Sequence, residues 1–541
     1  MCKLEHMVSL SLGKKLRSKG FQRALQLVIP PLLFLFTLLA WAIASPPGST
    51  ADADFHEVSI LCQQGDRPGI CSHVSKTQVK VTKDFAASLC YVRQIEDSAA
   101  CYKEQAGKPG LITTDRWNYS YQYPPTYFSF HGLFVDRDLT TTVMRTRILN
   151  VLIVTTLVGL VAGFLPGRQR INLWLTILLT QMPLGLSVIA SVNPSSWTLL
   201  APTLVFFSLR GFLIRKKANA EMSSGLSVSS KVPWVLLCLT IASFLFGANA
   251  RYDSVIFCIL ALCAALFTGV APGSVRSWFR GKRLLVLIVG VLAIGAGAAA
   301  VIVRFMRKAV FIDFFKTLAT GDSAAGQSRE IIIKNIYNFP LFIYGFYGGS
   351  FGLGWLELGM PALVCLISVV LVSGMFFLGL QCTSWKENIA TGLLLLAFLT
   401  IPLIWLYQVN VKVGDFVQPR YILPLFTLCV GTALFSFPVS KSLSRVQRWI
   451  LCIGAASAHL ISLHVYLIRY WKGTEYIPGE STWWWDAWWV PGPQLTIILG
   501  VLAYTALAVI VTVVLPKLTE SRPNDIRGKS EHTRKETLSK I

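Results

Sequence analysis

The chain has 541 residues, a formal net charge of +23, 53% hydrophobic residues and only 14% charged residues. A soluble domain carries about 25% charged residues, so this composition excludes an ordinary soluble protein and indicates a protein that lies in lipid. The basic residues gather in short segments between apolar runs, which is a signal of membrane topology and argues against nucleic acid as a partner.

Apolar runs near 20 residues, the length at which a helix crosses a hydrocarbon core of about 30 Å, recur along the chain. Twelve such spans are predicted, at residues 26–45, 147–165, 171–190, 195–213, 233–249, 254–271, 284–303, 360–380, 389–407, 421–437, 448–468 and 493–515. The first is too long, and too poor in a small-residue cleavage site, for a signal peptide, so we expect it to be retained. The fold class predicted is therefore an all-α polytopic membrane protein with about 12 transmembrane helices.

The distribution of basic residues predicts how the chain is oriented. Lys and Arg cluster before the first span and in alternate short loops, so both termini are expected in the cytoplasm. Residues 1–25 then form a cytoplasmic N-terminal segment, residues 26–515 the polytopic membrane domain, and residues 516–541 a polar, disordered cytoplasmic tail.

Two extracytoplasmic segments are long. Residues 46–146 exceed the length that a connection needs, so we expect them to form a structure of their own. Residues 304–359 open with RFMRKAVFIDFFKTL, in which apolar residues recur at helical spacing with basic residues between them, and an interfacial amphipathic helix is predicted there.

Four cysteines lie in the first of these segments: Cys62, Cys71, Cys90 and Cys101. An even number of cysteines outside the membrane predicts two disulfides, although three pairings are possible and the sequence does not choose between them.

The stretch ADADFHE (51–57) concentrates acidic residues just after the first span. In an extended segment Asp52 and Asp54 would share one side, whereas in a helical turn they would diverge and leave one facing a cleft. A carboxylate here could take a proton from a hydroxyl group, and the pair could hold a divalent cation against phosphate. The plain alternative is that the acids favour the start of a helix. His56 and Glu57 follow directly, and a single histidine is more often structural.

Three other polar sites are predicted at the outer ends of spans. In NARYDS (249–254), Arg251 and Asp253 could simply pair with each other. In VGDFVQPRYILPLF (413–426), Arg420 follows a proline at the mouth of a span, where it could bind a phosphate or lie among the headgroups as an anchor. Glu357 in GLGWLELGMP (352–361) could be a pocket wall or an anchor.

Six ordered stretches carry a resemblance: SPPGSTADADFHEVSILC, YQYPPTYFSFHGLF, SVNPSSW, ARYDS, GLGWLELGMP and VQPRYILPLF. From about residue 26 to 440 the chain resembles a bacterial, largely actinobacterial, family of multi-pass membrane proteins known as domain of unknown function 2142. That family is similar to the GT-C glycosyltransferases, which use sugars linked to polyprenyl phosphate and carry an acidic motif after the first span. Related sequences often have adjacent Asp-Glu here, whereas Ala53 separates Asp52 from Asp54. This leaves the base open, with Asp54 slightly favoured by its nearness to His56.

The resemblance implies a GT-C-like inverting glycosyltransferase at the outer face of the bacterial cell membrane. It would move a sugar from a polyprenyl-phosphate donor to an envelope glycan or protein acceptor, with membrane lipids as its other partners. The catalytic base would be Asp54 or Asp52, either of which could also hold a divalent cation. The substrate-binding residues implied are Arg420, Arg251, Asp253, His56, Glu57, Tyr123 and Glu357. A transporter or flippase of a lipid-linked precursor is the alternative, although it would favour ionisable residues at mid-membrane. A non-catalytic scaffold for envelope assembly is another.

Overall fold

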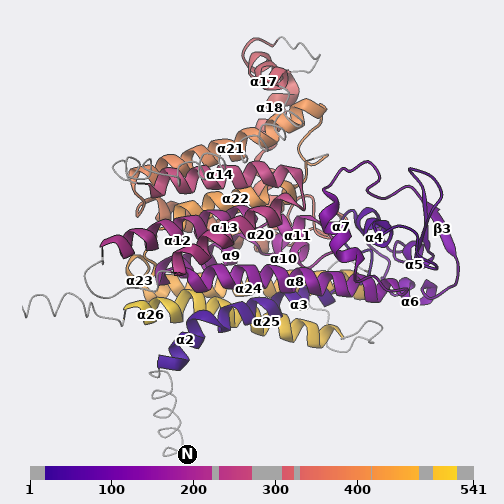
Figure 1. Ribbon diagram of the computed structural model, residues 1–541, viewed down its shortest axis with the longest axis horizontal. Coiled ribbons are helices and arrows are strands. Elements are labelled where there is room, and N and C mark those ends of the chain that lie inside the picture. Colours follow the sequence, from indigo (N-terminus) through magenta and orange to yellow (C-terminus); the bar gives the residue numbers. More distant parts are fainter. Residues whose placement is uncertain are drawn as a thin grey trace, which may run out of the picture.

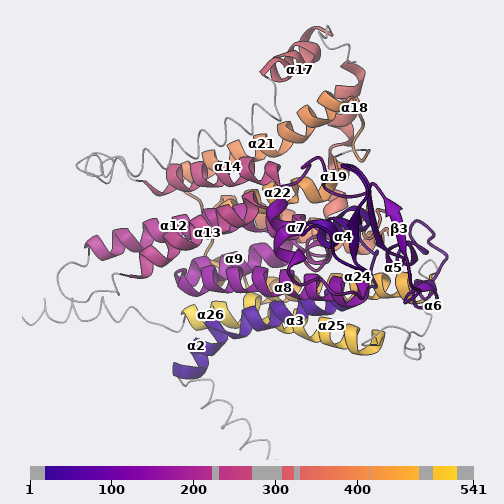
Figure 2. The same ribbon diagram turned by 45° about the vertical axis from the view of Figure 1, so that its right-hand side comes forward.

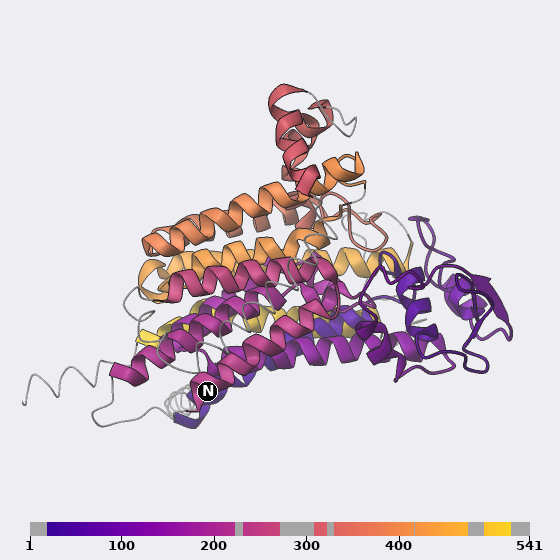
Figure 3. The same cartoon turned by 45° about the horizontal axis from the view of Figure 1, so that its top comes forward.

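The computed structural model describes residues 19–221, 231–270, 308–321, 329–415, 417–473 and 492–520. Its helices lie side by side in one bundle, which runs horizontally in Figure 1. Residues 46–146 cover the right-hand end of this bundle, and the helices nearest the two chain ends, α2 (Lys19–Leu27) and α26 (Leu515–Glu520), lie at the opposite end. Figure 3 shows residues 46–146 extending past the end of the bundle that they cover.

The prediction of an all-α polytopic membrane protein is confirmed. In the described part of the chain, seven helical stretches are long and apolar enough to cross a membrane, and three shorter helices are apolar. The long stretches contain α8 (Leu139–Phe164), α11 (Ser195–Thr198) with α12 (Ala201–Glu221), α14 (Tyr252–Gly269), α20 (Ala362–Leu380), α21 (Trp385–Val409), α24 (Arg445–Trp471), and α25 (Pro493–Val509) with η1 (Ile510–Val514) and α26. The shorter ones are α3 (Ile29–Ile43), α13 (Val232–Ala248) and α22 (Pro419–Leu434). A short helix, α23 (Val439–Ser442), precedes α24.

The predicted span 171–190 is not one continuous helix. It is divided into α9 (Gly167–Thr180) and α10 (Leu184–Ile189), because Pro183 has no N–H with which to continue the helical hydrogen bonds. The break is buried, and the Gln181 side chain donates to Thr427 Oγ1 at 2.8 Å. Non-helical backbone is tolerated at this depth because protein covers it. The predicted span 284–303 lies outside the described residues.

Residues 46–146 form a small α+β unit. Its elements are α4 (Ala53–Cys62), β1 (Cys71–His73), β2 (Val79–Thr82), α5 (Asp84–Ala87), α6 (Cys101–Gln105), β3 (Leu111–Thr114) and α7 (Pro125–Gly132). The three strands form an antiparallel sheet in the order β1-β2-β3. Disulfides join Cys62 to Cys71 and Cys90 to Cys101, so each bridge links neighbouring elements.

The second long segment contains α17 (Lys308–Thr320), α18 (Arg329–Asn338) and α19 (Pro340–Phe346). Figures 1 and 2 show α17 and α18 as an arm that stands away from the bundle near the end of α21. The arm is attached by polar contacts: Tyr407 on α21 donates to Asp313 Oδ2 at 2.6 Å, and Asn335 on α18 donates to the Val411 carbonyl at 2.9 Å.

One buried arginine holds the turn that connects α3 to α4. Arg147 on α8 is 1% exposed and donates to the carbonyls of Ala42 at 3.0 Å, Ser45 at 2.5 Å and Pro46 at 2.9 Å. It also donates to Ser49 Oγ at 3.1 Å. Because buried carbonyl groups without a donor are costly, this side chain fixes the course of the backbone just before the acidic stretch.

Replacing Arg147 by Ala should therefore destabilise the protein. Several buried carbonyl groups would lose their donor, and we expect a loss of about 3 kcal/mol or more. Arg145 on the same helix is half-exposed and pairs with Asp136 at 3.1 Å, so Arg145→Ala is a matched control with an expected cost of about 0.5 kcal/mol. Thermal unfolding in detergent measures both. Equal melting temperatures for the two variants would contradict the role given to Arg147.

Candidate functional site

Asp52 lies directly before α4 in an unusual backbone conformation. Its φ is 61°, in the left-handed region that non-glycine residues adopt at a cost, and its side chain makes no capping hydrogen bond to α4. An aspartate at this position ordinarily accepts from the first turn of its own helix. Here Asp52 Oδ2 accepts from Arg420 Nη2 at 2.6 Å. The backbone thus turns this carboxylate away from its helix and toward α22.

Arg420 is the buried member of this pair. Its side chain is 6% exposed, whereas that of Asp52 is 36% exposed. It also donates to the Tyr421 hydroxyl at 3.0 Å. Of the two roles predicted for Arg420, the anchor among lipid headgroups is wrong, because the guanidinium is enclosed by protein.

The charge on Asp52 follows from this contact. Burial is the largest single effect and raises the pKa of Asp52, but Arg420 and the smaller effects of His56, Arg116 and Arg251 together lower it by more. The net pKa lies below the usual value, so the carboxylate is ionised at neutral pH.

A second ion pair lies beside the first. Arg251, at the start of α14, donates from Nε to Asp253 Oδ1 at 3.0 Å and from Nη2 to Asp253 Oδ2 at 2.8 Å, as the sequence suggested. The guanidinium of Arg251 is 4.3 Å from the ring centre of Tyr421 and 5.4 Å from that of Tyr123. The Arg420 guanidinium is 4.8 Å from the Tyr421 ring, so two cations share one aromatic ring.

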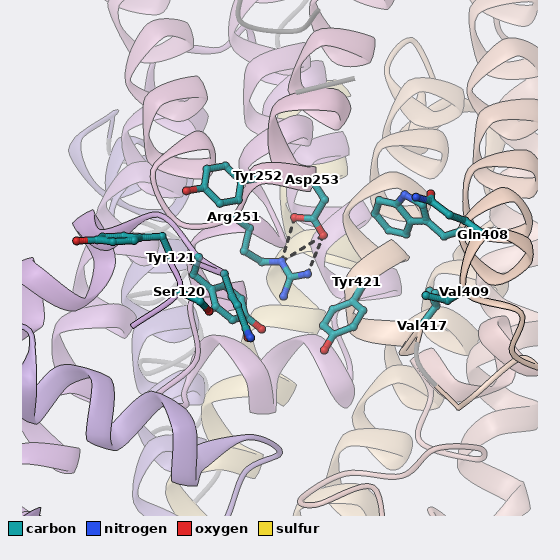
Figure 4. Close-up of a pocket in the computed structure, with 12 residues that line it drawn as sticks. Ser120, Tyr121, Arg251, Tyr252, Asp253, Gln408, Val409, Val417 and Tyr421 are labelled. Carbon is teal, nitrogen blue, oxygen red and sulfur yellow. Dashed lines mark hydrogen bonds and ion pairs between the residues drawn. The ribbon is translucent and has the colours of Figure 1, made fainter. Parts of the chain in front are cut away.

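A cavity of about 500 Å³ opens next to these residues (Figure 4). In the view, the Arg251–Asp253 pair and Tyr421 lie in the middle, with the loop of Ser120 and Tyr121 on one side and Gln408, Val409 and Val417 on the other. The lining residues are Ser120, Tyr121, Gln122, Tyr123, Arg251, Tyr252, Asp253, Trp405, Gln408, Val409, Val417 and Tyr421. A cavity of this size, largely aromatic and apolar with a few polar groups, is typical of sites for small ligands.

Asp54 has a different environment from Asp52. It accepts two hydrogen bonds from Arg116, from Nε at 2.6 Å and from Nη2 at 3.2 Å, and Arg116 is half-exposed. The two carboxylates therefore diverge at the start of the helix. Each is occupied by its own arginine, and among the described residues no group of three or more His, Cys, Asp or Glu side chains could hold a metal ion. In this arrangement the two acids therefore have different arginine partners.

His56 and Glu57 point into the protein. The His56 ring is stacked on Phe128 with 5.9 Å between the ring centres, and burial lowers its pKa to about 3. Within the described part of the chain, neither nitrogen of His56 has a hydrogen-bond partner. Glu57 Oε1 accepts from the Gly48 amide at 2.9 Å, while Oε2 is buried and has no partner among the same residues. Burial raises the pKa of Glu57 to about 7 although Gly48 and Arg147 oppose the shift.

Glu357 lies outside the cavity lining. It is 8% exposed and pairs with Arg469 at 2.8 Å. Arg469 also donates to the carbonyls of Tyr91, Gln94 and Asp97. The pair therefore joins α24 to residues 46–146.

Two residues of the cluster were not among the candidates from the sequence. Tyr421 was missed because a tyrosine next to an arginine at the end of a span is typical of a membrane interface. Arg116 was missed because it is a single cation in a polar loop. Arg147, by contrast, carried a signal, since an arginine at the start of an apolar run indicates a specific partner.

Residues 34–429 match a family model described as predicted membrane protein, DUF2142. The chain belongs to this family. The matched region contains Asp52, the Arg251–Asp253 pair and Arg420, and it ends within α22. No curated protein and no solved structure matches the chain. The family assignment predicted from the sequence is confirmed, and it establishes a membrane protein without specifying a reaction.

The raised pKa of Glu57 predicts that stability depends on pH. The folded-state value of about 7 lies above the unfolded value of about 4.3. The folded state therefore holds this proton more tightly, and the associated stability is present at low pH and is lost as pH rises through about 7. We expect the melting temperature in detergent to fall between pH 5 and pH 8.

The matched variant is Glu57→Gln, which retains an oxygen for the Gly48 amide and cannot ionise. Its melting temperature should change less over this pH range. Parallel curves for the wild type and the variant would show that Glu57 does not titrate there.

Proposed function

We propose that the protein is a glycosyltransferase of the bacterial cell membrane that moves a sugar from a polyprenyl-phosphate donor to an envelope acceptor. The observation that carries this proposal is the cluster of Asp52, Arg420, Tyr421 and Arg251 beside a cavity of about 500 Å³. A carboxylate that is partly exposed lies next to two buried cations, which are the groups needed to accept a proton and to hold a phosphate.

The placement of the disulfides supports an outer site. Both bridges lie in residues 46–146, and disulfides persist in oxidising compartments. The cavity is lined in part by residues of the same segment. Together with the clusters of Lys and Arg in the N-terminal segment and in alternate short loops, this arrangement favours a site at the outer face and both termini in the cytoplasm.

In the proposed reaction, the acceptor hydroxyl oxygen attacks the anomeric carbon of the donor sugar. The bond between that carbon and the phosphate oxygen breaks, and the electron pair leaves with the lipid phosphate. Asp52 takes the hydroxyl proton. Arg420 and Arg251 offset the charge that develops on the phosphate, since a guanidinium can bind two oxygens at once.

The ion pair with Arg420 also controls the proton affinity of Asp52. Arg420 keeps the carboxylate deprotonated before substrate arrives. A phosphate that competes for Arg420 would weaken this pair and add negative charge, and both effects raise the proton affinity of Asp52. Neither acid lines the cavity itself, but Asp52 pairs with Arg420, which contacts the cavity residue Tyr421, whereas both oxygens of Asp54 are held by Arg116. We therefore assign the base to Asp52 rather than Asp54.

Replacing Asp52 by Asn should lower transfer by about 10²–10⁴-fold, because the amide cannot accept the proton. Asp54→Asn is the matched control and should retain most activity, since Arg116 is half-exposed and can be solvated. The measurement is transfer from radiolabelled polyprenyl-phosphate sugars to envelope extracts by the purified protein in liposomes, normalised to folded protein. Undiminished transfer by Asp52→Asn, or a loss that only follows the amount of folded protein, would refute the role of Asp52.

Arg420 is expected to act on the leaving phosphate. Arg420→Lys keeps the charge but loses the planar fork, so partial activity should remain, and Arg420→Ala should lose more. If the contact strengthens as charge develops, turnover should fall more than donor affinity. The comparison needs kcat and KM for the donor in all three proteins. Equal turnover per folded molecule would leave Arg420 only as the structural partner of Asp52.

A further inference from the structure

A row of aromatic side chains follows β3 in the outer segment. Tyr119 is 42% exposed and Tyr121 is 58% exposed, and both alternate with the polar residues Asn118 and Ser120. Trp117 precedes them, partly exposed, with its ring centre 6.2 Å from that of Tyr119. Large exposed aromatic rings in a polar loop are costly to leave in water, and they indicate an interaction surface.

This loop is held in place by four hydrogen bonds, of which the one to Ser59 is buried. Asn118 is 2% exposed, its Nδ2 donates to the Tyr123 carbonyl at 3.0 Å, and its Oδ1 accepts from the Tyr123 amide at 3.1 Å. The Asn118 amide donates to Ser59 Oγ on α4 at 3.0 Å. Trp117 Nε1 donates to the Thr77 carbonyl at 3.1 Å. The aromatic rings therefore lie on a fixed loop. This loop is attached to α4, the helix that directly follows Asp52.

The aromatic row continues into the cavity. Ser120, Tyr121, Gln122 and Tyr123 all belong to the cavity lining. In Figure 4 Tyr121 lies at the edge of the cavity, with Arg251 and Tyr421 further in. The backbone at Tyr121 has a φ of 54°, a left-handed conformation that is uncommon for tyrosine. A molecule bound along this loop would reach the cavity without interruption.

We propose that Trp117, Tyr119 and Tyr121, here called the aromatic platform, bind an extended glycan chain and direct its end into the cavity. This inference rests on the proposed function and assigns the acceptor to carbohydrate rather than protein. Aromatic faces carry negative charge that attracts the C–H faces of sugar rings. The exposed polar side chains of Ser120 and Gln122 supply hydrogen-bond partners for sugar hydroxyls. An anchor for lipid headgroups would not need polar groups between the rings or a continuous path to the cavity.

The test measures binding, without transfer. Oligosaccharides of one to six residues, prepared from bacterial envelope polysaccharide, are titrated against the full-length protein in nanodiscs. Affinity should rise with chain length up to about three or four residues, as each ring contributes a factor of about 3–10. Tyr119→Ala and Tyr121→Asn should each lower the affinity for the longer oligosaccharides by that factor. Tyr119 lies outside the cavity lining, so Tyr119→Ala should leave binding of the single sugar unchanged. Asn is used at 121 because it tolerates the left-handed backbone.

The matched control is Tyr337→Ala on α18, since Tyr337 is 80% exposed and lies on the arm rather than the platform. It should bind all lengths as the wild type does. Absence of binding, affinity that does not depend on chain length, or equal losses in the control would overturn the proposal. The outcome is separable from the proposed function: length-dependent binding can persist in a protein without transfer, and transfer to a short acceptor can persist in the Tyr119→Ala variant.

Discussion

The position of the candidate site depends on the hydrogen bonds that the Arg147 guanidinium donates to carbonyl groups of the turn between α3 and α4. Arg147 holds one side of this turn. On the other side, Tyr91, Trp355 and Tyr470 donate to the carbonyls of residues 47, 48 and 49. These donors come from residues 46–146, the loop before α20, and α24. Because each carbonyl of residues 45–49 has a donor, the backbone that leads to Asp52 is fixed by four separate parts of the chain.

The fold was more predictable from the sequence than the site. Apolar runs near 20 residues report on the bilayer directly, so the spans were visible one at a time. The break between α9 and α10 was not, because the run 171–190 stays apolar through Pro183, and the groups that accommodate the break, such as Thr427, come from another helix. The pairing of the four cysteines was also open, since any of three arrangements fits their spacing.

Residue types alone were insufficient to predict which side chains meet at the candidate site. Asp52 and Arg420 were both candidates, but they are 368 positions apart, and no local pattern predicts that they meet. Asp54 looked equivalent to Asp52 in the sequence and slightly favoured, yet it pairs with the half-exposed Arg116, whereas Asp52 pairs with the buried Arg420. Tyr421 is important because two cations share its ring, a relation that appears only when α14 and α22 are placed together.

The arm formed by α17 and α18 has a mechanical consequence. Tyr407, which bonds to Asp313 of the arm, lies on α21 between Trp405 and Gln408 of the cavity wall. Asn335 of the arm accepts from the Val413 amide in the connection between α21 and α22. A displacement of the arm would therefore act on α21, the helix that carries Trp405, Gln408 and Val409 of the cavity wall. The arm and this wall of the cavity are thus joined through one helix and the connection that follows it.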